Sequence, residues 1–224
     1  MRPHHDHWPV RVPHAISVPS TSLWDNLATS ARRFPDKAAL EFLGRTTRYS
    51  ELMRQVEVLA AHLHQIGVRR GDRVVLDMQN CPQLVVAHFA ILRANAVVVP
   101  INPMNRAEEL KHYIADSDAR VALVTSELAA DMAKASNELP AADRLQHLIV
   151  THYTDAFDPA KAGEEAPPAT WNSWLIEPQA EAVLTISSTL PACGLSVAGL
   201  PAMSCNGASN IDFSAARAER IGIE

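Results

Sequence analysis

The stretch GVRRGDRVVLDMQNCPQLVVAHFAILRANAVVVPINP, residues 67–103, decides the fold. It holds a short apolar run, RVVLDM, then a longer run that is apolar nearly all round, QLVVAHFAILRA, and then a second short run, AVVVP. Short runs rich in β-branched residues are typical of buried strands, and the longer run is typical of a buried helix. Two strands joined through a helix require a crossover connection, which is right-handed by default. The stretch therefore predicts a βαβ unit of a parallel sheet.

Boundary residues support these elements. Pro82 suits the first turn of the buried helix, because its missing N–H would be unpaired there. Upstream, Ser50 is expected to cap another helix, and Gly67 is expected to end it in a left-handed conformation. Between them one apolar stripe recurs at helical spacing, formed by Leu52, Val56, Leu59, Ala60, Leu63 and Ile66.

The alternation continues downstream. Asn105 and Glu108 have the spacing of a capping box that opens the helix RAEELKHYIAD. Its buried face is expected to comprise Ala107, Leu110 and Ile114. RVALVT and QHLIVT follow as strands, with a helix from Ser126 to about Asn137 between them. Upstream, AALEFLG and RTTRYS read as a hairpin around Gly44. The predicted fold class is α/β, a parallel sheet flanked by helices.

Composition divides the chain into four segments. Residues 1–19 are expected to form a flexible arm without a signal peptide, and residues 20–151 the α/β domain. Residues 152–181 are acidic and proline-rich, as in a linker-like loop. Residues 182–224 form an atypical, irregular tail that we expect to be poorly ordered. Its uncharged part contains prolines and glycines, which do not suit a membrane-spanning helix.

Charge and cysteine content exclude several classes of function. The net charge is −5 and the chain has 20 Lys and Arg residues against 25 Asp and Glu, which argues against a nucleic-acid partner. Three scattered cysteines are too few for a disulfide framework or a thiolate metal site, so we expect a reducing, cytoplasmic location. His4, His5 and His7 are interpreted as part of the polar arm and not as metal ligands.

Three sequence elements resemble one known family. They are RTTRYSEL (Arg45–Leu52), GVRRGDRVVLDMQNCPQ (Gly67–Gln83) and ILRANAVVVPINPMNRAEEL (Ile91–Leu110). In this order and spacing they resemble the AMP-forming acyl-CoA synthetases, the adenylate-forming ligases. The Asn-Pro-Met-Asn sequence is most similar to the branch that acts on fatty or related carboxylic acids. The resemblance covers residues 20–184, about the first third of such an enzyme, and Asn95 stands where the family often has Gly.

The resemblance implies a two-step reaction. ATP and a medium- or long-chain fatty acid give an acyl-adenylate, and CoA then displaces AMP, with Mg²⁺ assisting the first step. The family holds the ATP phosphates with a loop close to Tyr-Thr-Ser-Gly-Thr-Thr-Gly-x-Pro-Lys-Gly. Here Ala182–Leu184 are followed by TISSTLPACGL, in which the loop's early glycines and lysine are missing. We therefore assign no catalytic residue, metal ligand or cofactor to this chain. The weak candidates for nucleotide contact are Thr185, Ser187, Ser188 and Thr189.

The remaining family motif residues are interpreted as structural. Tyr49 and Glu51 are placed at a strand-to-helix corner and Asp72 in a tight turn. The segment with Pro100, Asn102 and Pro103 redirects the chain from strand to helix.

The histidines do not form an obvious site. His62 and His64 are two residues apart on a helix, so they face different sides. His88, in an apolar helix, is interpreted as a core histidine.

Three functional readings stay open at this stage. In the first, the chain is a ligase by family that is inactive alone. In the second, it is a non-catalytic binding or assembly module whose unpaired sheet edge meets a partner or a second copy. In the third, it is one half of a split ligase that a second fragment completes. A frameshift near Leu184, a deletion and genuine divergence each account for the change in sequence character at that residue.

Overall fold

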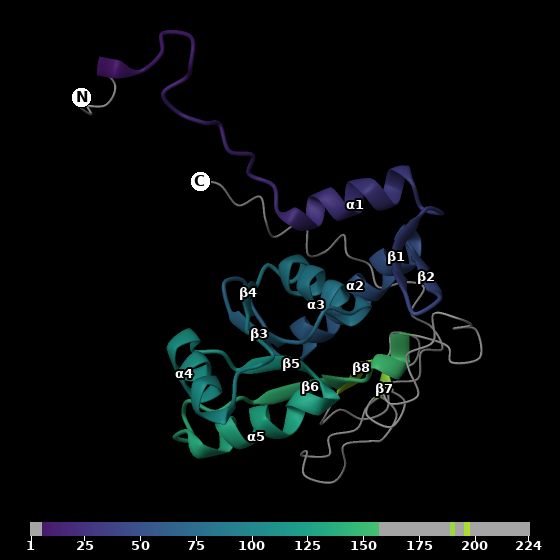
Figure 1. Ribbon diagram of the computed structural model, residues 1–224, viewed down its shortest axis with the longest axis vertical. Coiled ribbons are helices and arrows are strands. Elements are labelled where there is room, and N and C mark those ends of the chain that lie inside the picture. The colour runs from purple at the N-terminus through teal and green to yellow at the C-terminus, as the bar shows by residue number, and fades with distance from the viewer. Residues whose placement is uncertain (1–5, 157–188, 191–194, 198–224) are drawn as a thin grey trace.

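The computed structural model describes residues 6–156, 189–190 and 195–197 (Figure 1). The helices are α1 (Leu23–Arg33), α2 (Tyr49–Gln65), α3 (Pro82–Arg93), α4 (Ala107–Ser117) and α5 (Ala129–Glu138), with 3-10 turns η2 (Ser126–Leu128) and η3 (Tyr153–Ala156). The strands are β1 (Ala38–Phe42), β2 (Arg45–Arg48), β3 (Arg73–Asp77), β4 (Val97–Pro100), β5 (Val121–Thr125), β6 (His147–Thr151), β7 (Thr189–Leu190) and β8 (Leu195–Val197).

The main sheet has the order β4-β3-β5-β6-β8-β7. Strand β3 pairs in parallel with β4 and β5, and β5 pairs in parallel with β6. Helix α3 connects β3 to β4, and helix α4 connects β4 to β5 across the sheet. This arrangement confirms the predicted α/β fold with a parallel, helix-flanked sheet.

Helices cover both faces of the sheet (Figure 1). Helices α2 and α3 lie on one face, where Val74 and Leu76 of β3 join their core cluster. Helices α4 and α5 lie on the other face, where Val75 joins a second cluster. Because successive strand residues point to opposite faces, one short strand supplies both cores. The predicted buried face of α4, which comprises Ala107, Leu110 and Ile114, is confirmed.

Two predicted helix starts are wrong by one or two residues. Helix α2 begins at Tyr49 with Arg48 at the N-cap position, so Ser50 lies inside the first turn and does not cap it. Helix α4 has Arg106 at its N-cap, and the Arg106 N–H donates to Glu109 Oε2 at 2.6 Å. The expected pair of Asn105 and Glu108 is displaced because the Asn105 N–H instead closes a turn onto the Asn102 carbonyl at 3.0 Å.

Left-handed backbone occurs where the chain turns most sharply. Gly67 has φ +100° after α2, as predicted, and Gly71 has φ +87° before β3. Leu43 and Gly44 both have positive φ in the β1–β2 hairpin, which matches the mirror-image turns that hairpins favour. Asn95 has φ +58°, which explains why the family often uses Gly there and why Asn, which tolerates this region, can replace it.

Two short strands extend the sheet beyond β6. Strand β8 pairs antiparallel with β6 through Ile149 and Val197, and β7 pairs antiparallel with β8. The outer strands of the described sheet are therefore β4 and β7. The expectation of an irregular tail over residues 182–224 stays a prediction, since residues 182–188, 191–194 and 198–224 lie outside the described part, as do most residues of the predicted linker. Within the described residues, no helix is long and apolar enough to cross a membrane.

Candidate functional site

The carboxyl ends of the parallel strands gather polar side chains at one edge of the sheet. Asp77 ends β3, Thr125 ends β5 and Thr151 ends β6, and each of these residues is almost completely buried. In open α/β sheets, ligands usually bind outside this edge. The residues around this edge form a group that we call the carboxyl-end cluster; its members are Asp77, Cys81, Gln83, Thr125, Glu127 and Tyr153.

Glu127 forms the centre of the hydrogen bonds in the cluster. It lies in η2, directly after β5, and its Oε1 accepts hydrogen bonds from Thr125 Oγ1 at 2.7 Å and from Tyr153 Oη at 2.6 Å. Tyr153 is 6% exposed, and burial followed by the Glu127 contact raises the pKa of its phenol well above the ordinary value. The phenol is therefore protonated at neutral pH and acts as a donor to the carboxylate.

Asp77 is a carboxyl group inside the sheet. It is 1% exposed, and its Oδ1 has no hydrogen-bond partner. Burial, together with the charges of Glu127 and Asp131, raises the pKa of Asp77 to about 7. An isolated carboxylate is costly to bury. The neutral and ionised forms of Asp77 are therefore both populated near neutral pH.

Gln83 and Cys81 complete the cluster at the start of α3. Gln83 Nε2 donates to the carbonyl of His152 at 2.8 Å, whereas its Oε1 is buried without a partner. Cys81 is buried with a free thiol, and burial raises its pKa to about 11. A thiol with this pKa is protonated at neutral pH, so Cys81 packs as a small apolar residue and is not a nucleophile.

The unpaired atoms of the cluster share one chemical character. Asp77 Oδ1, Gln83 Oε1 and Glu127 Oε2 are all buried acceptors without donors. Such a set suits a group that offers N–H or O–H donors, and it repels phosphate oxygens. The cluster therefore does not fit the phosphates of ATP. Within the described residues, no group of three or more His, Cys, Asp and Glu side chains is arranged to hold a metal ion.

A shallow pocket lies beside the cluster. Its cavity of about 290 Å³ is lined by the loop after β3, Met78–Asn80, and the loop after β4, Asn102–Met104. Asn102 Oδ1 accepts the Met104 N–H at 3.1 Å, which fixes the second loop. Met104 is 83% exposed. This loop is the Asn-Pro-Met segment of the family motif, and its turn geometry confirms a structural role for Asn102.

Glu51 and Asp72 also make contacts that fix local structure. Glu51 lies in the first turn of α2, where its Oε1 accepts from Arg45 Nη2 at 2.9 Å. Asp72 accepts the Arg69 N–H at 2.7 Å and so closes the turn before β3.

The histidine predictions are confirmed only in part. His62 is 5% exposed and inside the core, whereas His64 Nδ1 contacts the Val68 carbonyl at 3.2 Å, so the two residues serve different surroundings. His88 is half-buried and stacks edge-on against Phe89 with centroids 5.5 Å apart, so its interpretation as a core residue is wrong. Helix α3 presents part of its surface to solvent, and His88 lies there. His7 is exposed, and His4 and His5 lie outside the described residues.

The predicted nucleotide contacts are only partly within the structure. Thr185, Ser187 and Ser188 lie outside the described residues. Thr189 begins β7, where it pairs with Ser196 of β8. Its role in nucleotide binding stays a prediction.

Sequence reasoning did not single out Asp77, Glu127 or Tyr153. The signal that could have found Asp77 is a charged residue within the apolar run VVLDM, since buried carboxylates need a partner or a raised pKa. Glu127 and Tyr153 follow separate strands and are 26 residues apart, so their contact depends on the strand order.

Comparison with known proteins identifies the family. A sequence model described as AMP-binding enzyme matches residues 27–189, which is more than half of the chain. A long-chain-fatty-acid–CoA ligase of Bacillus subtilis (strain 168) is 35% identical over 121 residues, 54% of this chain and 21% of that protein. A long-chain-fatty-acid–CoA ligase of Escherichia coli O6:H1 is 34% identical over 156 residues, 69% of this chain and 27% of that protein.

Solved structures agree with this assignment. An anthranilate–CoA ligase in complex with anthranoyl-AMP has a TM-score of 0.53 and 25% identity over 57% of this chain and 24% of that chain. A long-chain-fatty-acid–CoA ligase from Archaeoglobus fulgidus has a TM-score of 0.53 and 26% identity over 61% of this chain and 28% of that chain. The fold is thus that of an α/β adenylate-forming ligase, and the chain belongs to the AMP-binding enzyme family. It spans about a fifth to a quarter of the length of these ligases.

Proposed function

We propose that this chain provides the amino-terminal part of a ligase that activates a medium- or long-chain fatty acid as its acyl-adenylate and transfers the acyl group to CoA. The observation that carries the proposal is the match to the family over residues 27–189, together with relatives named as long-chain-fatty-acid–CoA ligases. A salicyl-AMP ligase of Mycobacterium tuberculosis, 34% identical over 180 residues, uses an aromatic acid by its name, so the family alone does not define the acid.

We further propose that the chain does not complete this reaction alone. The sequence after Leu184 lacks the early glycines and the lysine of the phosphate loop, and the carboxyl-end cluster presents acceptor atoms that repel phosphates. ATP, Mg²⁺ and CoA would therefore be held by residues that this chain does not supply. The reacting groups are contributed by a second polypeptide in the split-ligase reading.

A pyrophosphate-release assay tests the proposed inactivity. The purified chain is incubated with ATP, Mg²⁺ and decanoate or palmitate, and the Escherichia coli ligase serves as the positive control. We expect pyrophosphate release no higher than that of a sample without protein. Turnover above this background that depends on the fatty acid would contradict the proposal of an incomplete site.

A chimeric ligase tests the proposed substrate class separately. Residues 27–184 replace the matching segment of the Escherichia coli ligase, and acyl-CoA formation is measured for fatty and aromatic acids. We expect a folded chimera to prefer fatty acids to aromatic acids, as proposed for this chain. A folded chimera that forms acyl-adenylate only from aromatic acids would contradict the fatty-acid assignment while leaving the family intact.

The second reading, a non-catalytic assembly module, rests on the sheet edges. Strand β4 is an outer strand of the described sheet, and its Val97 is 47% exposed. Exposed apolar edge strands can pair with another chain. Size-exclusion chromatography coupled to light scattering distinguishes the readings, because a module that self-associates through β4 gives a dimer that Val97→Lys converts to a monomer.

A further inference from the structure

The amino ends of the parallel strands border a second cavity, so this cavity and the carboxyl-end cluster lie at opposite ends of the strands. Its volume is about 200 Å³, and its lining includes Gly67, Arg73, Asp118, Arg120 and His147. A water molecule occupies roughly 30 Å³ of liquid, so the cavity accommodates a phosphate-sized ion with a few waters. We call it the amino-end cavity. The proposed ligase reaction does not use it.

Two arginines and one histidine line this cavity, each at the start of a different strand. Arg73 begins β3, Arg120 directly precedes β5 and His147 begins β6. The parallel register places these strand starts side by side, since Val74 pairs with Val121, which in turn pairs with His147. Arg73 and His147 are 74 positions apart in the sequence (147 − 73 = 74), and both line the same cavity.

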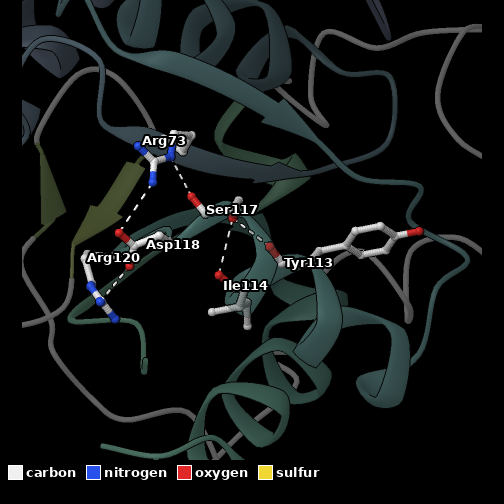
Figure 2. A network of polar contacts seen from close by, with 6 residues as sticks. All are labelled: Arg73, Tyr113, Ile114, Ser117, Asp118 and Arg120. Atoms are coloured by element: carbon white, nitrogen blue, oxygen red, sulfur yellow. Dashed lines mark hydrogen bonds and ion pairs between the residues drawn. The ribbon is translucent and has the colours of Figure 1, made fainter. Parts of the chain in front are cut away.

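Both arginines donate hydrogen bonds to groups at the C-terminal end of α4 (Figure 2). Not all of their N–H donors are used. Arg73 Nε donates to the Ser117 carbonyl at 2.6 Å, and Arg120 Nη2 donates to Asp118 Oδ1 at 2.7 Å. The contact between Arg73 Nη2 and Asp118 Oδ2 is long, at 3.4 Å. Arg120 Nη1 is buried and has no acceptor among the described residues. An unpaired charged donor is costly, so an acceptor that reaches Nη1 would be stabilising.

Two carboxylates that line the cavity, those of Asp72 and Asp118, oppose anion binding. Asp118 is the carboxylate between the two arginines, and its side chain is 60% exposed, so it can turn towards solvent. The Asp72 carboxylate also lines the cavity but is held by the Arg69 N–H at 2.7 Å. His62 lies buried behind the wall with its Nε2 unpaired, and its pKa is lowered by burial and by His147. An anion would favour the protonated form of both histidines.

We propose that the amino-end cavity binds a phosphate-sized oxyanion between Arg73, Arg120 and His147. The Arg120 guanidinium turns so that its unpaired Nη1 donates to the anion, and the anion replaces the long Arg73 contact to Asp118. Such charge-assisted hydrogen bonds to arginine are among the stronger polar contacts in proteins. The ligand is either free phosphate or the phosphate group of a phosphomonoester.

Amide NMR of the full ¹⁵N-labelled chain tests the proposal. Sodium phosphate is titrated at constant ionic strength against chloride, because phosphate also stabilises proteins non-specifically. We expect saturable shifts at Gly67, Arg120 and His147. Shifts that grow linearly without saturation, or that spread over unrelated basic residues, would overturn the site. A parallel titration with AMP distinguishes the two phosphate sources. The same shifts with AMP would show that the cavity also binds a phosphomonoester, and no shifts with AMP would restrict the site to free phosphate.

Matched arginine variants separate a built site from general charge. We expect Arg120→Gln to weaken phosphate binding about tenfold, the effect of losing roughly 1.4 kcal/mol. Arg106→Gln removes an equal charge from the start of α4, outside the cavity lining, and should leave the affinity unchanged. His147→Gln is the second variant if Arg120→Gln does not fold, and it should also weaken binding. Equal loss in Arg106→Gln, or full affinity in both cavity variants, would overturn the proposal.

Discussion

The two ends of the parallel sheet differ in how their polar groups are satisfied. At the amino end, Arg73, Asp118 and Arg120 pair opposite charges around the last turn of α4 (Figure 2). At the carboxyl end, Asp77 and Glu127 carry like charge and leave buried acceptors unpaired. The amino end thus brings opposite charges together, although Arg120 Nη1 stays unpaired, whereas the carboxyl end is destabilised by its own charge. Functional sites in proteins often retain such unfavourable arrangements.

Asp77→Asn gives the largest expected change. The folded-state pKa of Asp77 is about 7, compared with an ordinary value of 3.8. Because this pKa is raised, the folded chain binds the proton more tightly, and stability falls as pH rises from about 4 to 7. Each pKa unit corresponds to roughly 1.4 kcal/mol, so the loss at pH 8 amounts to a few kcal/mol. The variant should lose this pH dependence and be more stable than the parent at pH 8.

Urea unfolding at pH 4, 6 and 8 measures this effect. At pH 4 the parent Asp77 is protonated, so the two chains should have similar free energies of unfolding. A parent chain whose stability does not decrease over this window, with Asp77→Asn showing the same profile, would contradict the raised pKa.

Tyr153→Phe tests the main hydrogen bond of the carboxyl-end cluster. The substitution removes the donor at 2.6 Å from Glu127 Oε1 and leaves Thr125 as the donor recorded for that oxygen. Loss of a hydrogen bond to a half-buried charge should lower the free energy of unfolding by about 1–3 kcal/mol. Thermal and urea unfolding measure the change. Tyr113→Phe, at a residue 37% exposed, is the control and should have little effect.

Arg73→Gln tests the paired amino end. It removes the donor to the Ser117 carbonyl at 2.6 Å and the cation at the C-terminus of α4. We expect a loss of about 1 kcal/mol, since the guanidinium is partly exposed and its ion pair with Asp118 is long. The loss should shrink in high salt. A salt-independent loss would indicate that packing of the arginine stem, and not charge, stabilises this end.

Substitutions at Asn95 give an expected effect no larger than that of Arg73→Gln. Its φ of +58° lies in the left-handed region, and its carbonyl accepts the Gly71 N–H at 2.9 Å in the turns that precede β3 and β4. Asn95→Ala should destabilise the chain by about 1 kcal/mol, whereas Asn95→Gly should be close to neutral. Urea unfolding of the pair measures the difference. Equal stability of both variants would show that the conformation carries no strain for alanine.

Local patterns were sufficient to predict most elements. The apolar run of β3 and Pro82 at the start of α3 are short-range signals, as is the stripe that buries Leu110 and Ile114. The starts of α2 and α4 were misplaced because competing turn bonds, such as that of Asn105 to Asn102, decide which residue becomes the cap. His88 was misassigned because composition does not show which side of an apolar helix meets solvent.

The sequence by itself determined the α/β class, the family and the positions of strands β1 to β6, because periodicity, turn residues and motif spacing are local properties of the chain. Only the tertiary structure decided which residues meet. The strand order β4-β3-β5-β6 places Glu127 against Tyr153 and Arg73 against Asp118. The pKa of Asp77 likewise depends on burial and on charges from other elements. These contacts arise from long-range pairing, and no local pattern encodes the distance between two side chains on separate strands.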